Sequence, residues 1–442
     1  MLRRSNLKGY IIDKIVDKVV VKMFADDTTV YLDALDSFEE LQVLLKKWCE
    51  ASSTKFNVEK TEIIPVGTIE HRERVIATRK LNANDPPIPK NIHIVQEKEA
   101  VQILGGHIGN GIDTFVLWTP IVERIDSRLE RYDRWHPTLE GRKNIVQISV
   151  GAMTQYKTQV NGMPERIVKY LIRATREFMA GGAKSSPISL DMLMATIADG
   201  GKNLLDLKAR NEAIQLMKLK SYLNLGPERA IWGYIADSNF ELNNVTANDS
   251  TEAPTYFETA EGDESSKEGF DGARVLAEYG SRKEHPDNII SSVTPEFELR
   301  GAKLSSLMQA IAYAEIKKAK GPPARKATDN MIKQVQASIK QNFNRIPLPA
   351  DIWKSARHKN FTRQVRNFLW KSLHNAHRIG NFWTHIPECE DRAISQFYSV
   401  TEDLEHILLK CERPGQHQIW NLAKELWLKK HDRWPDFPSG LF

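Results

Sequence analysis

The sequence is short of cysteine and of long apolar runs, and each shortage excludes a class of protein. It contains only three cysteines, Cys49, Cys389 and Cys411. Three cysteines cannot form a disulfide framework, which favours a reducing, intracellular compartment. No apolar run is long enough to span a membrane, so we expect no membrane partner. The basic first ten residues are not followed by the apolar stretch of a secretory signal.

The composition that remains is that of a folded chain with a charged surface. With 442 residues, of which 41% are hydrophobic, the chain can build two or three domains. Its mean hydropathy of −0.44 indicates that much of the surface is charged. Short strands alternate with helices over residues 1–105, whereas helical periodicity dominates from Pro120 onward. We therefore predict an α+β fold.

The most informative segment is Phe24-Ala25-Asp26-Asp27, which lies between two β-rich runs. Residues 19–24 (VVVKMF) and 28–32 (TTVYL) are typical of strands, and the tight turn between them, with its pair of Asp, predicts a β-hairpin that aims carboxylates outward. Two carboxylates on a rigid turn suit Mg²⁺, which takes oxygen ligands and leaves positions for substrate phosphates. An isolated Asp-Asp pair is also compatible with an ordinary polar turn.

The segments after this hairpin follow in a recognisable order. An amphipathic helix from Leu41 leads to SSTKFN at 52–57, then to KTE at 60–62 and the apolar run IIPV at 63–66. This order of hairpin, helix, SxxKxN, KTE and strand resembles the reverse transcriptase of non-LTR retrotransposons of the kind found in fungi. The sequence ILGG at 103–106 stands where that family has its primer-grip hairpin. Residues 118–147 resemble its thumb-like region, and the resemblance covers most of residues 1–225 and 350–425.

The resemblance implies an RNA-directed DNA polymerase in the nucleus, with RNA and DNA as template and primer. Asp26 would bind the catalytic Mg²⁺ and Asp27 would assist, while Lys60 would approach the pyrophosphate as a general acid. The alternative for Lys60 is one more solvated lysine at the start of a strand. Ser53 stands where the family usually has glycine, so a positive φ there would cost stability.

Parts of the family pattern are missing from this chain. The earlier palm aspartate, which binds both metals in the family, has no counterpart, and neither has the Gly-rich segment. Residues 1–10 resemble the end of the long helix that follows that segment. Because Asp26 and Asp27 alone cannot hold two metals, we expect the C-terminal half of a polymerase that is inactive by itself. Two alternatives are a non-catalytic nucleic-acid-binding remnant and a non-functional product of a decayed element.

The C-terminal EHILLKC resembles the end of the family's zinc-binding module. His406 and Cys411 have a spacing suited to two Zn²⁺ ligands. Ser395 and Tyr398, however, stand where the family has a Cys-x-x-Cys, and two ligands do not close a tetrahedral site. Two further candidate ligands lie upstream, His385 and Cys389. The alternative is a helix-borne histidine and a buried cysteine with no metal.

Charge is unevenly distributed over the second half of the chain. Residues 237–271 hold ten acidic residues and one basic residue, which predicts a disordered linker, whereas residues 300–378 hold 17 basic and three acidic residues. The candidate nucleic-acid-binding side chains in the basic region are Arg357, Lys359, Arg363, Arg366 and Lys371. Aromatic residues between them could stack on bases. The helical spacing of Phe361, Val365 and Phe368 favours a place in the core instead.

Four regions follow from these patterns. They are a partial palm (1–105), a helical thumb-like region (106–236), an acidic linker (237–299) and a basic helical module with a degenerate zinc-binding region (300–442). Helices are predicted from Ile121 to Tyr132, from Arg166 to Met179 and from Asn203 to Leu223, with Gly141 as a break between the first two.

Overall fold

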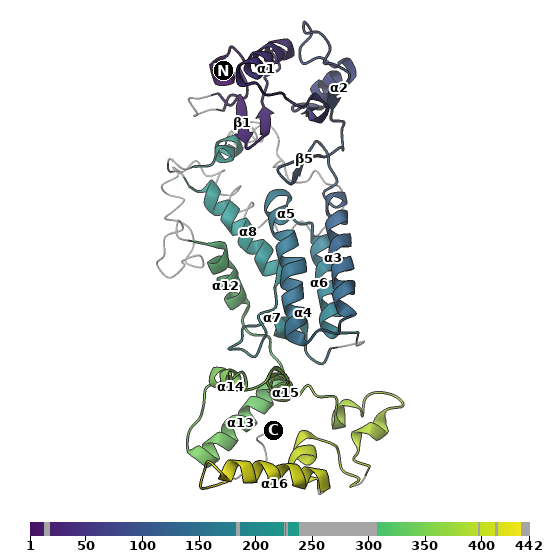
Figure 1. Ribbon diagram of the computed structural model, residues 1–442, viewed down its shortest axis with the longest axis vertical. Coiled ribbons are helices and arrows are strands. Elements are labelled where there is room, and N and C mark those ends of the chain that lie inside the picture. Colours follow the sequence, from purple (N-terminus) through teal and green to yellow (C-terminus); the bar gives the residue numbers. More distant parts are fainter. Residues whose placement is uncertain are drawn as a thin grey trace, which may run out of the picture. The chain divides into compact units, whose positions relative to one another are not determined.

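The computed structural model (Figure 1) combines many helices with small sheets. It describes residues 1–12, 18–182, 186–224, 226, 229–237, 307–396, 398–411 and 414–434. The mixed composition agrees with the predicted α+β class at this coarse level. The predicted acidic linker lies outside the described residues, apart from Asp237. No helix within these ranges is long and apolar enough to cross a membrane.

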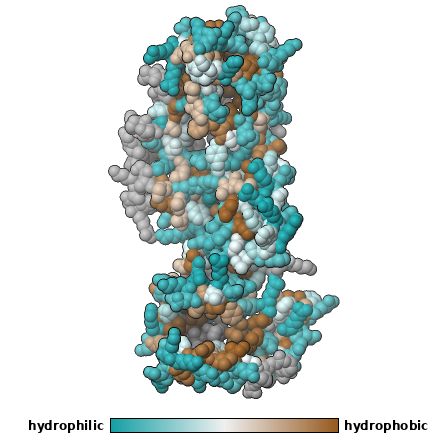
Figure 2. Space-filling view, viewed as in Figure 1, coloured by the Kyte–Doolittle hydropathy of each residue, from teal (hydrophilic) through white to brown (hydrophobic). Residues whose placement is uncertain are grey.

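The chain forms two compact units, each built from three segments. Unit 1 contains Met1–Arg124, Met153–Leu171 and Lys208–Ile316, and unit 2 contains Ile125–Ala152, Ile172–Leu207 and Lys317–Phe442. Figure 2 shows a mostly hydrophilic surface, as the mean hydropathy predicts, with apolar side chains that gather near the bottom of the view.

The strands lie in unit 1 and pair two by two. Their bounds are β1 Val21–Phe24, β2 Asp27–Val30, β3 Glu62–Ile63, β4 His93–Ile94, β5 Val101–Ile103 and β6 Gly106–Ile108. Antiparallel pairing joins β1 to β2 and β5 to β6, while β3 and β4 are parallel. In the first hairpin Val21 faces Val30 and Phe24 faces Asp27. The hairpin predicted around Asp26 is therefore present, with shorter strands than expected.

Two apolar clusters hold the β1–β2 and β3–β4 pairs against the first helix of unit 1. Leu7, Val20 and Leu41 form one cluster, and a second is formed by Ile88, Ile92 and Ile94. Phe38, the first residue of α1 (Phe38–Ser52), packs against both. Burial of this apolar surface fixes where the β1–β2 hairpin begins.

A buried carboxylate joins two loops beside the first cluster. Asp36, which is 5% exposed, accepts backbone hydrogen bonds from Lys8 (2.7 Å), Gly9 (2.9 Å) and Asp33 (2.8 Å). Hydrogen bonds to an ionised acceptor are stronger than neutral ones, and here they compensate the carboxylate for its lost water. The chain before β1 is thereby tied to the segment after β2.

Helices make up most of the rest of the chain. The α-helices after α1 are α2 Ile69–Thr78, α3 Thr119–Asp133, α4 Leu139–Val146, α5 Met153–Asn161, α6 Glu165–Ala180, α7 Leu190–Met194, α8 Leu207–Tyr222, α12 Gln309–Lys320, α13 Lys326–Phe343, α14 Pro349–Ala356, α15 Arg363–Leu373 and α16 Pro414–Leu428. Short 3₁₀ turns lie at Leu2–Arg4, Val58–Lys60, Val116–Trp118, Gly380–Phe382 and Glu390–Ala393, and π-helical turns at Gln147–Ala152 and His406–Lys410. Hydroxyl side chains accept from the first turns of several helices, as expected for N-caps: Ser37, Thr68, Thr138, Ser189 and Thr362.

The predicted helices match α3, α6 and α8 to within a few residues, but the predicted break at Gly141 is wrong. The chain leaves helical geometry before Pro137, where His136 has φ of +46°. Proline disfavours helical geometry in the residue before it, and Thr138 then caps the new helix. Gly141 lies inside α4, where its backbone N–H bonds to the Thr138 hydroxyl.

A histidine fills the centre of the C-terminal part of unit 2. His374 is 0% exposed, and its Nε2 lies 3.0 Å from the carbonyl oxygen of Gly200. The same carbonyl accepts from Trp370 Nε1 at 2.7 Å. The Thr328 hydroxyl lies 2.8 Å from His374 Nδ1, and the Trp353 ring packs at 4.8 Å from the imidazole. Segments far apart in sequence thus meet at one imidazole.

Candidate functional site

The tip of the β1–β2 hairpin carries the first two candidate residues. Ala25 and Asp26 form the two-residue loop, with Ala25 at φ +52°, and Asp27 begins β2 opposite Phe24. Both aspartates are exposed. Among the described residues, no group of three or more His, Cys, Asp or Glu side chains is placed to hold a metal ion. The hairpin therefore presents two carboxylates to solvent, and a cation bound there needs further ligands from elsewhere.

The segment after α1 shows the backbone that the sequence suggested. Ser53 has φ of +54° and ψ of +27°, the left-handed conformation that the family's glycine would adopt without strain. Lys60 ends the 3₁₀ turn Val58–Lys60 and is exposed. Its backbone N–H donates to the side chain of Asn57 at 3.3 Å. The Lys60 side chain is exposed just before β3.

The β5–β6 hairpin is attached to α5 by side chains that sequence reasoning missed. Its turn consists of Leu104 (φ +49°) and Gly105 (φ +78°), and the Tyr156 hydroxyl donates to the Leu104 carbonyl. The side chain of Asn161 bonds both to the backbone N–H of His107 (3.1 Å) and to its carbonyl (2.6 Å). No motif marks these α5 residues in the sequence. They are ordinary polar and aromatic positions of a helix, with Tyr156 exposed and Asn161 half-buried, so the sequence gives no signal for these contacts.

A lysine–histidine pair completes this attachment. Lys157 Nζ lies 2.5 Å from His107 Nδ1, and Lys157 is 4% exposed. Burial lowers the pKa of His107, and the Lys157 charge lowers it further. Burial also lowers the pKa of Lys157. A neutral imidazole can accept from the ammonium, whereas a protonated one would repel it, so the contact requires neutral His107.

The predicted basic residues lie on α15 and the turn before it. Lys359 and Arg363 are exposed, whereas Arg357, Arg366 and Lys371 are half-buried. In the part of the chain that the structure describes, none of the five forms an ion pair. Lys359 and Arg363 are therefore free to contact phosphate, while Arg357, whose Nη1 atom is buried, is the least accessible.

The division of the apolar residues of this region into buried and exposed ones differs from the prediction. Phe361 and Val365, expected in the core, are 39% and 40% exposed, so that expectation is wrong for both. Trp353 and Trp370 instead fill the core, at 4% and 2% exposed. The buried face of α15 is thus shifted toward its C-terminal turn, because contacts with the Gly200 loop occur there. Phe361 remains available beside the exposed cations.

The region with the predicted zinc ligands contains an isolated β-bridge between Ile394 and Thr401, followed by the π-helical turn His406–Lys410. The backbone N–H of Ser395 donates to Val400 O at 2.7 Å, and Tyr398 meets the His406 ring edge-on at 5.5 Å. His406 is 9% exposed, and its Nε2 has no hydrogen-bond partner among the described residues. Cys411 is half-buried, and its backbone N–H donates to His406 O at 2.8 Å. The structure thus places Tyr398 beside His406 and joins Cys411 to His406 through the backbone, and no group of three or more His, Cys, Asp or Glu side chains forms there among the described residues.

Comparison with known proteins adds no family to these observations. No protein-family model matches this chain, and no curated protein was found to match it. The resemblance described above therefore rests on the motifs and their order.

Proposed function

We propose that this chain is part of an RNA-directed DNA polymerase of a non-LTR retrotransposon. The observation that carries the proposal is the ordered series of motifs from the FADD hairpin to ILGG at 103–106. The parent reaction is nucleotidyl transfer to a primer 3′-hydroxyl with two Mg²⁺ ions. One ion would lower the pKa of that hydroxyl, and the other would stabilise the leaving pyrophosphate.

Three backbone features support the proposal because each fits what its motif requires. Asp26 lies in a two-residue hairpin loop, Ser53 has a positive φ where the family has glycine, and ILGG forms a tight turn. The primer-grip candidate is also held rigidly by α5. A part that positions a primer terminus needs such support, since small displacements of reacting atoms cost large factors in rate.

The same proposal predicts that this polypeptide does not polymerise DNA alone. Asp26 and Asp27 supply one hairpin pair of carboxylates, and two-metal catalysis needs a further carboxylate to bridge the ions. Lys60, exposed before β3, would serve as the general acid only once a nucleotide is held there.

Primer extension tests this reading. The full chain is incubated with Mg²⁺, nucleotides and an RNA template annealed to a DNA primer, beside Asp26→Ala and an Asp113→Ala control outside the motif. We expect no extension above the Asp26→Ala background. Extension by the wild type and by Asp113→Ala that disappears in Asp26→Ala would refute the predicted inactivity and establish the polymerase.

A non-catalytic nucleic-acid-binding role is the second candidate. It is favoured by Lys359 and Arg363, which are exposed and form no ion pair with any described residue, and by exposed Phe361 between them. Each phosphate neutralised on a single strand contributes about 0.7 log units of affinity per log unit of salt.

A salt series in a filter-binding assay tests this role. Arg363→Glu/Arg366→Glu should lower the salt slope by about 1.4 if each side chain contacts one phosphate. Lys333→Glu/Lys340→Glu makes the same charge change at exposed positions of α13 and should have a smaller effect. Equal slopes for the two double variants would show that α15 is no specific contact surface.

A further inference from the structure

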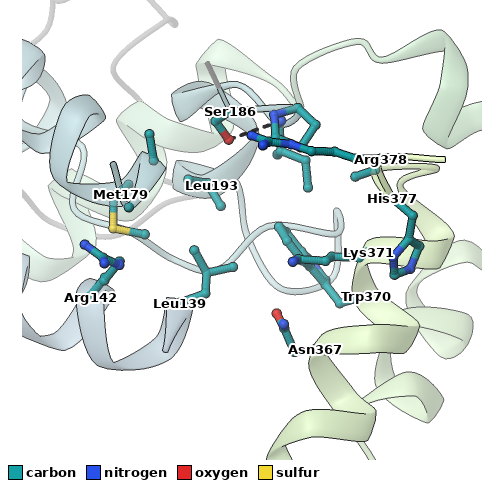
Figure 3. A pocket seen from close by; sticks show the side chains of 15 residues that line it. Leu139, Arg142, Met179, Ser186, Leu193, Asn367, Trp370, Lys371, His377 and Arg378 are labelled. Carbon is teal, nitrogen blue, oxygen red and sulfur yellow. Dashed lines mark hydrogen bonds between the residues drawn. The ribbon is translucent and has the colours of Figure 1, made fainter. Parts of the chain in front are cut away.

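A cavity in unit 2 borders the basic helix α15 and shares Lys371 with the candidate nucleic-acid-binding residues. Its volume is about 480 Å³, and Figure 3 shows α15 side chains on one side and residues of α4 and α6 on the other. The segment before α7 contributes Ser186, Pro187 and Ile188, and α7 itself contributes Leu193. This volume is within the range of pockets that bind small molecules.

The lining carries positive charge without a carboxylate. Arg142, Lys371 and Arg378 line the cavity, and no Asp or Glu does. The charge of Arg142 is balanced, because its Nη1 donates to Asp133 at 2.5 Å and to the Phe178 carbonyl at 2.7 Å. Lys371 forms no ion pair with any described residue. The cavity therefore favours an anion on its α15 side.

The cavity lining also contains an unpaired polar atom and an apolar wall. The Asn367 Oδ1 atom is buried and has no hydrogen-bond partner among the described residues, and Figure 3 shows this side chain directed from α15 toward the cavity. Leu139, Met179 and Leu193 form an apolar wall across from it. An unpaired buried acceptor is costly, so a turn of the Asn367 side chain that exposes Oδ1 to a donor on a ligand, while the ligand covers the apolar wall, would be stabilising.

We propose that this cavity binds a nucleotide 5′-phosphate, either free or at the end of a strand. The phosphate would lie against Lys371 and Arg378. Two cations favour a doubly charged phosphate as the ligand over a singly charged carboxylate. The base would cover Leu139 and Met179, and its N–H groups, which an alkyl chain lacks, would donate to Asn367. The proposal goes beyond the polymerase reading, because a chain that neither extends primers nor grips long nucleic acid can still bind a mononucleotide.

Titration calorimetry of the full chain with AMP tests the proposal. Adenosine, which lacks the phosphate, should bind at least tenfold more weakly. Lys371→Gln should weaken AMP binding about tenfold, the loss expected for one charge-assisted hydrogen bond, and Lys371→Arg should retain most of it. Asn367→Leu should weaken AMP binding as well. Lys333→Gln, an exposed change on α13 outside the cavity, should leave AMP binding unchanged.

A 5′-phosphorylated oligonucleotide and its 5′-hydroxyl form separate the two sources of the ligand. A preference for the phosphorylated strand that Lys371→Gln abolishes assigns a strand end, whereas AMP binding without that preference assigns a free nucleotide. The proposal is overturned if the wild type, shown to be folded by circular dichroism, binds neither AMP nor the phosphorylated end in preference to its hydroxyl form. It is also overturned if Lys371→Gln and Lys333→Gln bind alike.

Discussion

Acid should destabilise unit 2 through His374. The imidazole is 0% exposed and lies between Trp353, at 4.8 Å, and Trp370, at 4.6 Å. Its neutral form satisfies both partners, since Nε2–H donates to Gly200 O and Nδ1 accepts from Thr328. Burial lowers the pKa of His374 from 6.5 to about 4, and the nearby charges of Arg325 and Lys202 act in the same direction.

The sign and size of the effect follow from this shift. The unfolded chain takes up the proton near pH 6.5, while the folded chain resists it until about pH 4. The stabilising contribution is thus complete above pH 6.5 and is lost as the pH falls toward 4. By linkage, the loss is about 2 kcal/mol at pH 5 and about 3 kcal/mol at pH 4.

Urea unfolding followed by tryptophan fluorescence measures the effect, because two tryptophans flank the imidazole. His374→Gln cannot titrate, so the difference in unfolding free energy between wild type and this variant should shrink by about 2 kcal/mol from pH 7 to pH 5. His358→Gln, at an exposed position, serves as the matched control. If wild type and His374→Gln lose the same stability over this range, His374 does not carry the acid sensitivity.

Two backbone positions give further predictions, each checked by urea unfolding against a matched variant. Ser53→Gly should raise the free energy of unfolding by about 1 kcal/mol, because glycine adopts the positive φ without strain. Asn344→Gly should raise it by less, since asparagine tolerates the φ of +49° at the end of α13. A stability loss at Ser53→Gly would contradict this. Gly200→Ala should cost about 2–4 kcal/mol, because φ is +86° and the added Cβ would lie 2.5 Å from the Trp353 ring. Gly182→Ala, with φ of +77° and open space around the added Cβ, should lose only the stability due to backbone strain. Equal stability losses for Gly200→Ala and Gly182→Ala would exclude the clash with Trp353.

Features governed by local sequence could be predicted. The β1–β2 hairpin follows from strand-forming runs on both sides of Ala25-Asp26, and the helices α3, α6 and α8 follow from apolar spacing. The positive φ at Ser53 could be anticipated, because a motif with glycine at that position indicates a backbone conformation that favours glycine. In each case a few neighbouring residues determine the conformation.

Features that depend on distant contacts could not be predicted. Trp370 is buried because the Gly200 loop, 170 residues earlier, supplies a carbonyl for its indole N–H, and nothing in the spacing around α15 indicates that loop. Phe361 and Val365 fit the same helical pattern yet remain exposed. The support of the β5–β6 hairpin by Asn161 likewise spans 54 residues and involves a single amide. Polar contacts of this kind leave no periodic pattern in the sequence, so sequence analysis does not detect them.

The exposure of Asp26 and Asp27 connects metal binding to nucleic-acid binding. Two solvated carboxylates hold Mg²⁺ weakly, because the ion dehydrates reluctantly and prefers six well-placed oxygens. Phosphate oxygens of a bound strand would complete the coordination, so each ligand should strengthen the other by the same factor. The cations of α15, in contrast, bind phosphate without a metal. Mg²⁺-dependent affinity that requires Asp26 would therefore indicate that the hairpin carboxylates bind a metal together with the strand, whereas metal-independent affinity that requires Arg363 would indicate only the basic helix.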